Sequence, residues 1–339
     1  MTASSMRLIK DAETVSFEEH THNLPPPLPD EVTLKVAYAG VCGSDIARYR
    51  GSAYHYPITI GHEFSGVVDA SGKETDGMRT VVFPVLPCHE CEACKKGLYA
   101  LCENYDYYGS RRDGAFTTAL NVRKENLLRV PDNVSLREAA MCEPAAVALN
   151  ALRKAKDITG RKIAVYGAGT IGLLVLSIAK ALGATECLFF DPDMKHREFA
   201  AKLGFEEIVD RNDADIYVDA CGHISALTDM ISRAKPCSEL ILLGNPSGDA
   251  DIPKDIYWKI LRRELTLYGT WNSRYSMPGE SFRNDWKDIL GLMETGKLDV
   301  KPLITHILPL SDADRALRIM TDRDEFSVKV MLNCGGEAE

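Results

Sequence analysis

The sequence has no apolar run long enough to cross a lipid bilayer. Its most apolar stretch, residues 171–184, is interrupted by Lys180 and falls short of the roughly 20 residues that a membrane-spanning helix needs. Basic residues are also scarce relative to acidic ones, with 40 Lys and Arg against 49 Asp and Glu and a net charge of −9. Because nucleic-acid binders concentrate uncompensated Lys and Arg, we expect neither a membrane nor a nucleic acid as partner.

A secretory signal is missing from the pattern as well. Charged residues interrupt residues 1–13 before an apolar segment of the kind found in signal peptides can form. The sequence therefore predicts a cytoplasmic protein. Ten cysteines are present, and in a reducing compartment a chain of this length uses them for metal binding rather than for disulfides.

With 339 residues, of which 45% are apolar and 26% charged, the chain is a soluble globular sequence too long for one core. Residues 1–145 contain β-type runs such as VTLKVAYAG and FSGVVDA between Gly, Pro and Asp, which predicts a β-rich domain. The tail, residues 272–339, has helical patterns at 285–296 and 312–322 and a strand pattern at 326–332. We expect this tail to return to the first domain.

Residues 146–271 have a different pattern. A strand-like RKIAVY leads into GAGTIG, a helical LLVLSIAKALGA and a second strand, ECLFFD, which is a βαβ unit. Further apolar runs, IYVDACG, ELILLGN and LTLYGTW, alternate with helical patterns. The segment therefore predicts an α/β domain with a doubly wound parallel sheet.

The glycine motif of this segment predicts dinucleotide binding. Glycine triples are common in turns, and an ordinary βα turn is the alternative, but here a strand precedes the motif and a helix follows it. Asp191 ends the next strand, where its carboxylate suits ribose hydroxyls and disfavours a 2′-phosphate, so NAD is expected. The predicted cofactor-binding residues are Gly167, Gly169, Thr170, Ile171, Gly172 and Asp191.

Four cysteines in C-x2-C-x2-C-x7-C spacing lie within residues 86–104. Four close thiolates can surround one Zn²⁺ tetrahedrally and leave no position for substrate, which indicates a structural zinc; free thiols or an iron–sulfur cluster are the alternatives. The predicted ligands are Cys88, Cys91, Cys94 and Cys102.

A second donor set is scattered over Cys42, His62, Glu63 and Glu143. A sulfur, an imidazole and a carboxylate, with a fourth position for water, substrate or the second carboxylate, describe a catalytic zinc. Taken singly, each residue has an ordinary explanation, because a lone Cys is usually core and a lone Glu is usually solvated.

An ordered set of motifs resembles the zinc-containing medium-chain dehydrogenases over nearly the whole chain. These motifs are GVCGSD (40–45), GHEFSG (61–66), the four-cysteine segment, CEP (142–144), GAGTIG (167–172) and ITHILPL (304–310). The resemblance implies a GroES-like catalytic domain at 1–145, a Rossmann domain at 146–271, a return segment at 272–339 and an active site in the cleft between the domains.

Three phrases, YHYPITIGHEFSG, YDYYGSRRDGAF and KILRRELTLYGTW, are similar to the branch that oxidises galactitol 1-phosphate. The resemblance implies a catalytic zinc on Cys42, His62 and Glu143, with Glu63 as a ligand or close reserve. Ser44 then takes the proton of the substrate hydroxyl, while hydride passes to NAD. Many relatives carry a relay His where this chain has Ala47, so the path beyond Ser44 must differ. Asp45 is expected to orient His62, with an exposed turn residue as the alternative.

The expected substrate is a polyol phosphate, oxidised at a secondary hydroxyl to a ketose phosphate. Paired guanidinium groups at Arg111 and Arg112 suit a phosphate, although arginines in loops are often only solvated. Tyr54, His55, Tyr56 and Trp271 are further candidates for the substrate pocket, or packing residues. The alternatives are an unphosphorylated polyol, threonine or a simple alcohol as substrate, or a catalytically silent NAD-binding protein. We expect a homodimer or homotetramer.

Overall fold

The computed structural model describes the chain except for residues 71–74, 210–212, 323–324 and 337–339. The described residues form two units. The first unit comprises Met1–Glu143, Arg274–Gly296 and Val300–Glu339, and the second comprises Pro144–Ser273 with Lys297–Asp299. Every helix in the described part of the chain is too short or too polar to span a bilayer.

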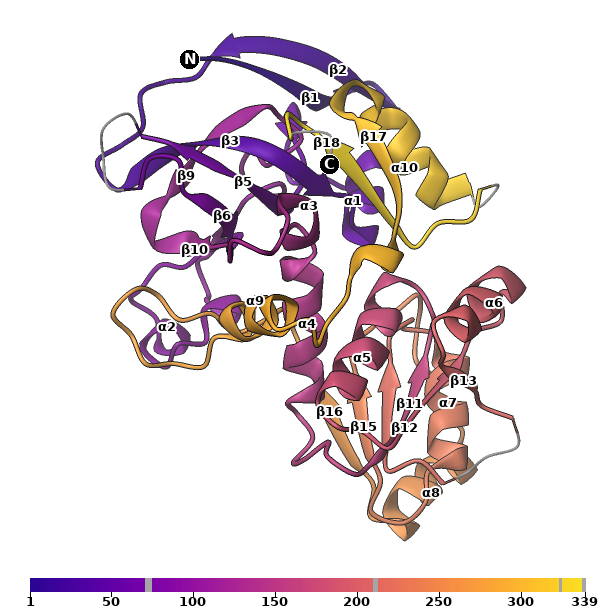
Figure 1. Cartoon of the computed structure of the whole chain (residues 1–339). Coiled ribbons are helices and arrows are strands. Elements are labelled where there is room, and N and C mark those ends of the chain that lie inside the picture. The colour runs from indigo at the N-terminus through magenta and orange to yellow at the C-terminus, as the bar shows by residue number, and fades with distance from the viewer. Residues whose placement is uncertain (71–74, 210–212, 323–324, 337–339) are drawn as a thin grey trace. The chain divides into compact units, whose positions relative to one another are not determined.

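Antiparallel strands build most of the first unit (Figure 1). Its larger sheet has seven strands in the order β10-β6-β5-β3-β18-β17, with β9 paired to β3. These strands are β3 (Glu31–Gly40), β5 (Glu63–Asp69), β6 (Arg79–Val82), β9 (Ala119–Arg123), β10 (Leu127–Arg129), β17 (Ile304–Pro309) and β18 (Lys329–Asn333). The strands predicted from VTLKVAYAG and FSGVVDA are thereby confirmed as β3 and β5.

A three-stranded sheet in the order β2-β1-β4 and a two-stranded pair, β7 with β8, complete the strands of this unit. Their bounds are β1 (Thr2–Asp11), β2 (Thr14–Asn23), β4 (Ile58–Thr59), β7 (Val85–Leu86) and β8 (Asp106–Tyr107). The helices are α1 (Gly43–Tyr49), α2 (Glu92–Lys95), α3 (Leu136–Ala139), α9 (Asp285–Glu294) and α10 (Ala313–Asp322), with the first residues of α4 (Cys142–Leu152). Short 3-10 helices lie at Tyr99–Leu101, Lys124–Asn126, Lys301–Leu303 and Leu310–Asp312.

Most of the tail of the chain packs into the first unit, with Lys297–Asp299 in the second. Strand β18 pairs antiparallel with β3, so that Met331 lies opposite Gly40. Helix α9 contributes Trp286, whose ring meets that of Phe83 edge-on at 5.7 Å, while Tyr275 stacks on Phe83 at 4.5 Å. Burial of these aromatic rings joins segments that lie about 200 residues apart in the sequence into one core.

The second unit is built on a parallel sheet in the order β13-β12-β11-β14-β15-β16 (Figure 1). The strands are β11 (Lys162–Tyr166), β12 (Glu186–Phe190), β13 (Glu206–Glu207), β14 (Ile216–Asp219), β15 (Glu239–Leu242) and β16 (Thr266–Gly269). The helices are α5 (Thr170–Ala181), α6 (Met194–Lys202), α7 (Ile224–Arg233) and α8 (Lys254–Arg262). This order confirms the doubly wound sheet, and its reversal between β11 and β14 is where such sheets bind ligands.

Candidate metal and nucleotide sites

Cys42, His62 and Glu63 come together in the first unit. Cys42 is the N-cap of α1, and Glu63 begins β5, opposite Gly40 at the end of β3. One ligand atom from each of the three residues lies within 4.8 Å of the other two. His62 and Glu63 are 4% and 2% exposed, so their polar atoms need partners inside the protein. We call these three residues the donor group.

Asp45 and Arg48 support the donor group from α1. Asp45 is completely buried rather than an exposed turn residue, and it accepts a hydrogen bond from the Cys42 backbone N–H at 3.0 Å. Its Oδ1 lies 3.6 Å from Nδ1 of His62 and 3.3 Å from Nη1 of Arg48. Asp45 thus faces the imidazole that would carry the metal, the arrangement by which a carboxylate orients a histidine ligand.

The charges around the donor group favour a cation. Burial lowers the pKa of His62, but Asp45 and Cys42 together raise it well above its usual range. Burial raises the pKa of Glu143 to about 7, although the charge of His62 opposes this. Sulfur, imidazole and carboxylate are the donors that zinc takes, and each binds the ion in its deprotonated form.

Glu143 lies in the first turn of α4 and is 5% exposed. Its carboxylate interacts electrostatically with His62 and Glu63. Its oxygens, however, are not among the ligand atoms that all lie within 4.8 Å of one another. Of the two carboxylates considered from the sequence, the structure therefore brings Glu63 into the donor group and leaves Glu143 facing it.

Lys329 is a neighbour of the donor group that sequence reasoning missed. It begins β18, is 2% exposed, and its ammonium group forms an ion pair with Glu63 and donates to the Val41 carbonyl at 3.0 Å. The available signal was a single Lys inside the apolar run FSVKVML. A lysine is rarely buried without a charged partner, and here that partner is Glu63.

The four cysteines of residues 86–104 form a second cluster, whose sulfur atoms all lie within 4.8 Å of one another. Cys88 and Cys94 have sulfurs 3.9 Å apart, and those of Cys91 and Cys94 are 3.5 Å apart. Zinc bound at roughly 2.3 Å to four sulfurs sets neighbouring sulfurs about 3.8 Å apart, so the spacing fits this ion. All ten cysteines of the chain are free thiols.

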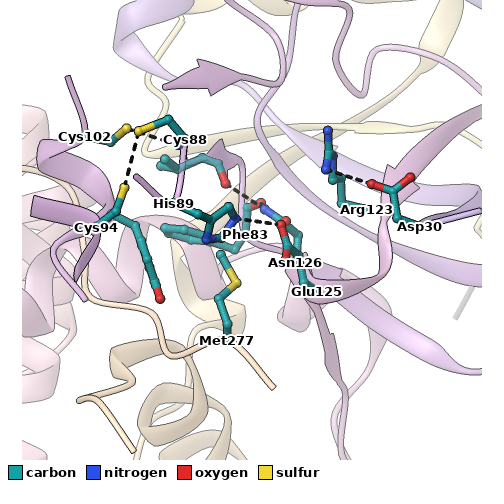
Figure 2. A network of polar contacts seen from close by, with 12 residues as sticks. Asp30, Phe83, Cys88, His89, Cys94, Cys102, Arg123, Glu125, Asn126 and Met277 are labelled. Carbon is teal, nitrogen blue, oxygen red and sulfur yellow. Dashed lines mark hydrogen bonds and ion pairs between the residues drawn. The ribbon is translucent and has the colours of Figure 1, made fainter. Parts of the chain in front are cut away.

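The surroundings of the cysteine cluster act differently on its thiols. Burial raises the pKa of Cys94 and Cys102, whereas hydrogen bonds from backbone N–H groups lower the pKa of Cys88 and Cys91. Backbone N–H groups of Glu103 and Cys94 lower the pKa of Cys91 to about 6, and zinc requires its cysteine ligands deprotonated. Figure 2 shows Cys88, Cys94 and Cys102 gathered beside His89. The ring of His89 contacts Glu125 at 3.1 Å, which links the cluster to the 3-10 helix between β9 and β10.

The glycine loop joins β11 to α5 in the second unit. Gly167 has a φ of +99°, which side-chain-bearing residues rarely adopt, and a Cβ on Gly172 would lie 1.7 Å from the Gly167 carbonyl oxygen. A Cβ on Gly169, by contrast, would meet nothing within 4 Å. The loop thus needs glycine for its turn and its packing, and at Gly169 leaves open space beside the N-terminus of α5. A phosphate bridge fits there.

Asp191 stands at the end of β12, next to this loop. Its carboxylate accepts hydrogen bonds from the Ala168 N–H at 2.7 Å and the Asp193 N–H at 2.8 Å. These bonds link the end of β12 to the glycine loop, where the sequence predicts the ribose of the dinucleotide.

Comparison with known proteins identifies the family of the chain. Residues 28–132 match the alcohol dehydrogenase GroES-like domain, and residues 170–295 match the zinc-binding dehydrogenase domain. The chain is 32% identical to galactitol 1-phosphate 5-dehydrogenase of Escherichia coli K12, over 89% of this chain and 92% of the relative. It belongs to the zinc-binding dehydrogenases. The family, the enzyme class and the fold class predicted from the sequence are thereby confirmed.

Solved structures of similar dehydrogenases share the whole fold. The galactitol-1-phosphate dehydrogenase of Escherichia coli has a TM-score of 0.86 with 30% identity, and covers 97% of this chain and 99% of its own. An alcohol dehydrogenase of Escherichia coli CFT073, solved with NADH, also has a TM-score of 0.86, with 26% identity and coverage of 98% and 100%. Zinc and a nicotinamide dinucleotide are thus the cofactors of this zinc-binding dehydrogenase, and the donor group, the cysteine cluster and the glycine loop fit them.

The predicted substrate residues of this dehydrogenase lie in different surroundings. Arg112 is engaged, since its Nε lies 2.6 Å from Oδ2 of Asp106. Arg111 is exposed and lies over the ring of Tyr54, which is 69% exposed. Trp271 follows β16 in the second unit and is 57% exposed. His55 and Tyr56 lie in the loop before β4. The Tyr56 hydroxyl donates to the Arg48 carbonyl at 2.6 Å, which indicates a packing role.

Proposed function

We propose that this zinc-binding dehydrogenase oxidises a secondary hydroxyl of a polyol phosphate, such as galactitol 1-phosphate, to the ketose phosphate with NAD. The observation that carries the proposal is the donor group: a thiol, an imidazole and a carboxylate gathered within 4.8 Å in a chain whose relatives include a galactitol 1-phosphate 5-dehydrogenase. Other relatives act on 2-dehydro-3-deoxy-L-galactonate and L-idonate, which makes sugar-derived hydroxyls the general substrate class.

The proposed ligands of the catalytic zinc are Cys42, His62 and Glu143. Glu63 is proposed either as a further ligand or as a nearby carboxylate that can replace one. Cys88, Cys91, Cys94 and Cys102 are the proposed ligands of the structural zinc. When bound, the catalytic zinc supplies a Lewis acid that lowers the pKa of the substrate hydroxyl, as it lowers that of water to roughly 7, and NAD supplies the hydride acceptor.

Ser44 is the proposed acceptor of the hydroxyl proton. Its Oγ donates to Sγ of Cys42 at 3.4 Å, so the hydroxyl faces the donor group, and it accepts from Nη1 of Arg48 at 3.2 Å. Since position 47 is Ala, Ser44 passes the proton to water, to a ribose hydroxyl of the cofactor or to another side chain. Arg48 stays protonated and therefore orients Ser44 without relaying the proton itself.

The proposed assignment of NAD over NADP depends on Asp191, whose carboxylate would repel a 2′-phosphate.

We also propose a role for each domain. Residues 1–145 and 272–339 bind zinc and substrate, and residues 146–271 bind NAD. The proposed location is the cytoplasm, where reducing conditions keep cysteines available for zinc. We also propose a homodimer or homotetramer.

A substrate panel tests the proposed function. Initial rates with NAD are measured for galactitol 1-phosphate, galactitol, sorbitol and threonine, on protein loaded with zinc. We expect the highest kcat/KM for galactitol 1-phosphate. Turnover of threonine alone would assign a different substrate class, and no turnover of any substrate by protein that binds NAD would favour the catalytically silent alternative.

A further inference from the structure

Arg111 is held by aromatic rings in a way that leaves its charge exposed. Its guanidinium carbon lies 4.1 Å from the ring centre of Tyr105 and 5.0 Å from that of Tyr54, and its Nη1 donates to the Tyr105 carbonyl at 3.0 Å. A guanidinium stacked on a ring keeps its N–H donors at its edge, and it presents five of them in a fixed plane. The ring contacts and the hydrogen bonds to Tyr54 and Tyr105 together orient Arg111, and they use part of its five N–H donors.

Arg112, the next residue, is arranged differently. Its Nε contacts the Asp106 carboxylate at 2.6 Å, and its guanidinium lies 5.6 Å from the ring centre of the buried Tyr108. This ion pair neutralises the Arg112 charge and occupies part of its donor edge. In the pair of arginines that the sequence offers, only Arg111 combines an oriented guanidinium with an uncompensated charge among the ion pairs of the described residues.

A strip of tyrosines connects Arg111 to the donor group within the first unit. The ring of Tyr105 meets that of Tyr107 edge-on at 6.3 Å, and Tyr107 lies 5.6 Å from the ring of His62. Rigid aromatic side chains thus fix the guanidinium relative to the metal ligand. A substrate with a hydroxyl at the donor group and an anionic end can lie along such a strip, because tyrosines offer both apolar faces and hydroxyl groups to a polyol chain.

We propose that Arg111, stacked on Tyr54 and Tyr105, binds the phosphate of the substrate and sets the preference for phosphorylated over unphosphorylated polyols, whereas Arg112 is structural. This inference rests on the proposed function, since it names the residue that recognises the anionic end of the same substrate. A planar guanidinium and a phosphate form two parallel hydrogen bonds, which an unphosphorylated polyol cannot match.

The test compares Arg111→Gln with its neighbour Arg112→Gln in zinc-loaded protein. We expect Arg111→Gln to raise the KM for galactitol 1-phosphate about ten- to a hundredfold, which is the range for a lost hydrogen bond to a charged group. The ratio of kcat/KM for galactitol 1-phosphate over galactitol then falls by a similar factor. Arg111→Lys should recover part of the ratio, and Arg112→Gln should keep it within about threefold of the wild type.

Titration with inorganic phosphate separates this inference from the proposed function. Binding is measured by calorimetry on the NAD-free protein, and we expect Arg111→Gln to weaken it while Arg112→Gln does not. If the wild type turned over no polyol at all, the proposed function would fail, and the phosphate titration alone would decide the role of Arg111. Equal kcat/KM for galactitol and its phosphate in the wild type, or equal losses in the two arginine variants, would overturn the inference while leaving a polyol dehydrogenase.

Discussion

The ion pair of Glu63 and Lys329 shows how a buried residue in this enzyme depends on its partner. Both side chains are 2% exposed, and each compensates the buried charge of the other. Burial alone lowers the pKa of Lys329, but the charges of Glu63 and Cys42 raise it above its usual value. The pair therefore brings a second positive charge, besides the metal, to the carboxylate of the donor group.

Removing one member of this pair tests that dependence. We expect Lys329→Met to lower the free energy of unfolding of the metal-free protein by about 3–5 kcal/mol, because Glu63 is left charged and unpaired in the core. The measurement is denaturation by urea after chelation of zinc. Added zinc should restore part of the loss, and Lys329→Met combined with Glu63→Gln should lose less than the single variant.

Lys35→Met is the control, since Lys35 is 59% exposed and pairs with Asp69 at 2.8 Å on the surface. Such a pair contributes about 1 kcal/mol or less, so this variant should remain close to the wild type. Similar losses at Lys35 and Lys329 would contradict the stated cause.

We propose that the Asp191 carboxylate also sets the choice of nicotinamide cofactor. We expect Asp191→Ser to lower the ratio of kcat/KM for NAD over NADP by about tenfold or more, because the bonds to the ribose hydroxyls and the repulsion of a 2′-phosphate are both lost. The check is steady-state kinetics with each cofactor. Asp193→Ser is the matched control, because Asp193 caps α6 through the Lys195 N–H at 2.7 Å and Ser caps equally well. A ratio unchanged in Asp191→Ser would remove this residue from the cofactor site.

At the scale of elements, the contact between β11 and α5 determines where the N-terminus of α5 lies in the second unit. The helix can approach the strand only because Gly172 has no side chain, as its Cβ would lie 1.7 Å from the Gly167 carbonyl oxygen. Neither atom belongs to a flexible side chain, so relief requires a shift of backbone. The position of the helix N-terminus that would bind the dinucleotide phosphates depends on this contact.

Two glycine-to-alanine variants separate packing from binding at this contact, and a third, in α9 of the first unit, is the control. We expect Gly172→Ala to destabilise the protein by about 1–3 kcal/mol and to abolish NAD binding, because α5 is pushed off the sheet. Gly169→Ala should keep the thermal stability but weaken NAD binding, since its methyl group enters the space for the pyrophosphate. Gly291→Ala, in the interior of α9 with nothing within 4 Å, should stabilise the protein by about 0.5–1 kcal/mol.

Thermal unfolding and NAD titration by fluorescence measure these three effects. NAD binding by Gly172→Ala with wild-type affinity would show that the close approach of α5 is not needed for the cofactor site.

The sequence predicted elements where a period could be followed over many residues. Runs such as IYVDACG and ELILLGN alternate with helices for long enough to predict a parallel sheet, and β14 and β15 follow them. Short elements such as α2, with four residues, carry no such period. The cysteine cluster was predictable because its spacing is local, whereas the scattered donor group needed the family resemblance. Lys329 was missed because no local pattern tells which strand lies beside Glu63.

For the whole molecule, two metal sites with different donor atoms predict two separable zinc ions per chain. We expect metal analysis to find two zinc ions in active protein. Dipicolinate should remove the ion of the donor group first, with loss of activity and little change in the unfolding temperature, because that site keeps a position open to small ligands. The ion of the cysteine cluster should leave only after thiol modification, and its loss should lower the unfolding temperature, since its four ligands close the loop of residues 86–104.

Cys91→Ser provides the control, because it removes one ligand of the cysteine cluster and none of the donor group. This variant should bind one zinc ion per chain and have a lower unfolding temperature. Dipicolinate should still remove the remaining ion. Release of both ions together would mean that the two sites are not independent. Wild-type protein that holds a single ion, retained against dipicolinate and lost in Cys91→Ser, would leave the donor group without a metal, and the fold would then bind NAD without a catalyst for hydroxyl oxidation.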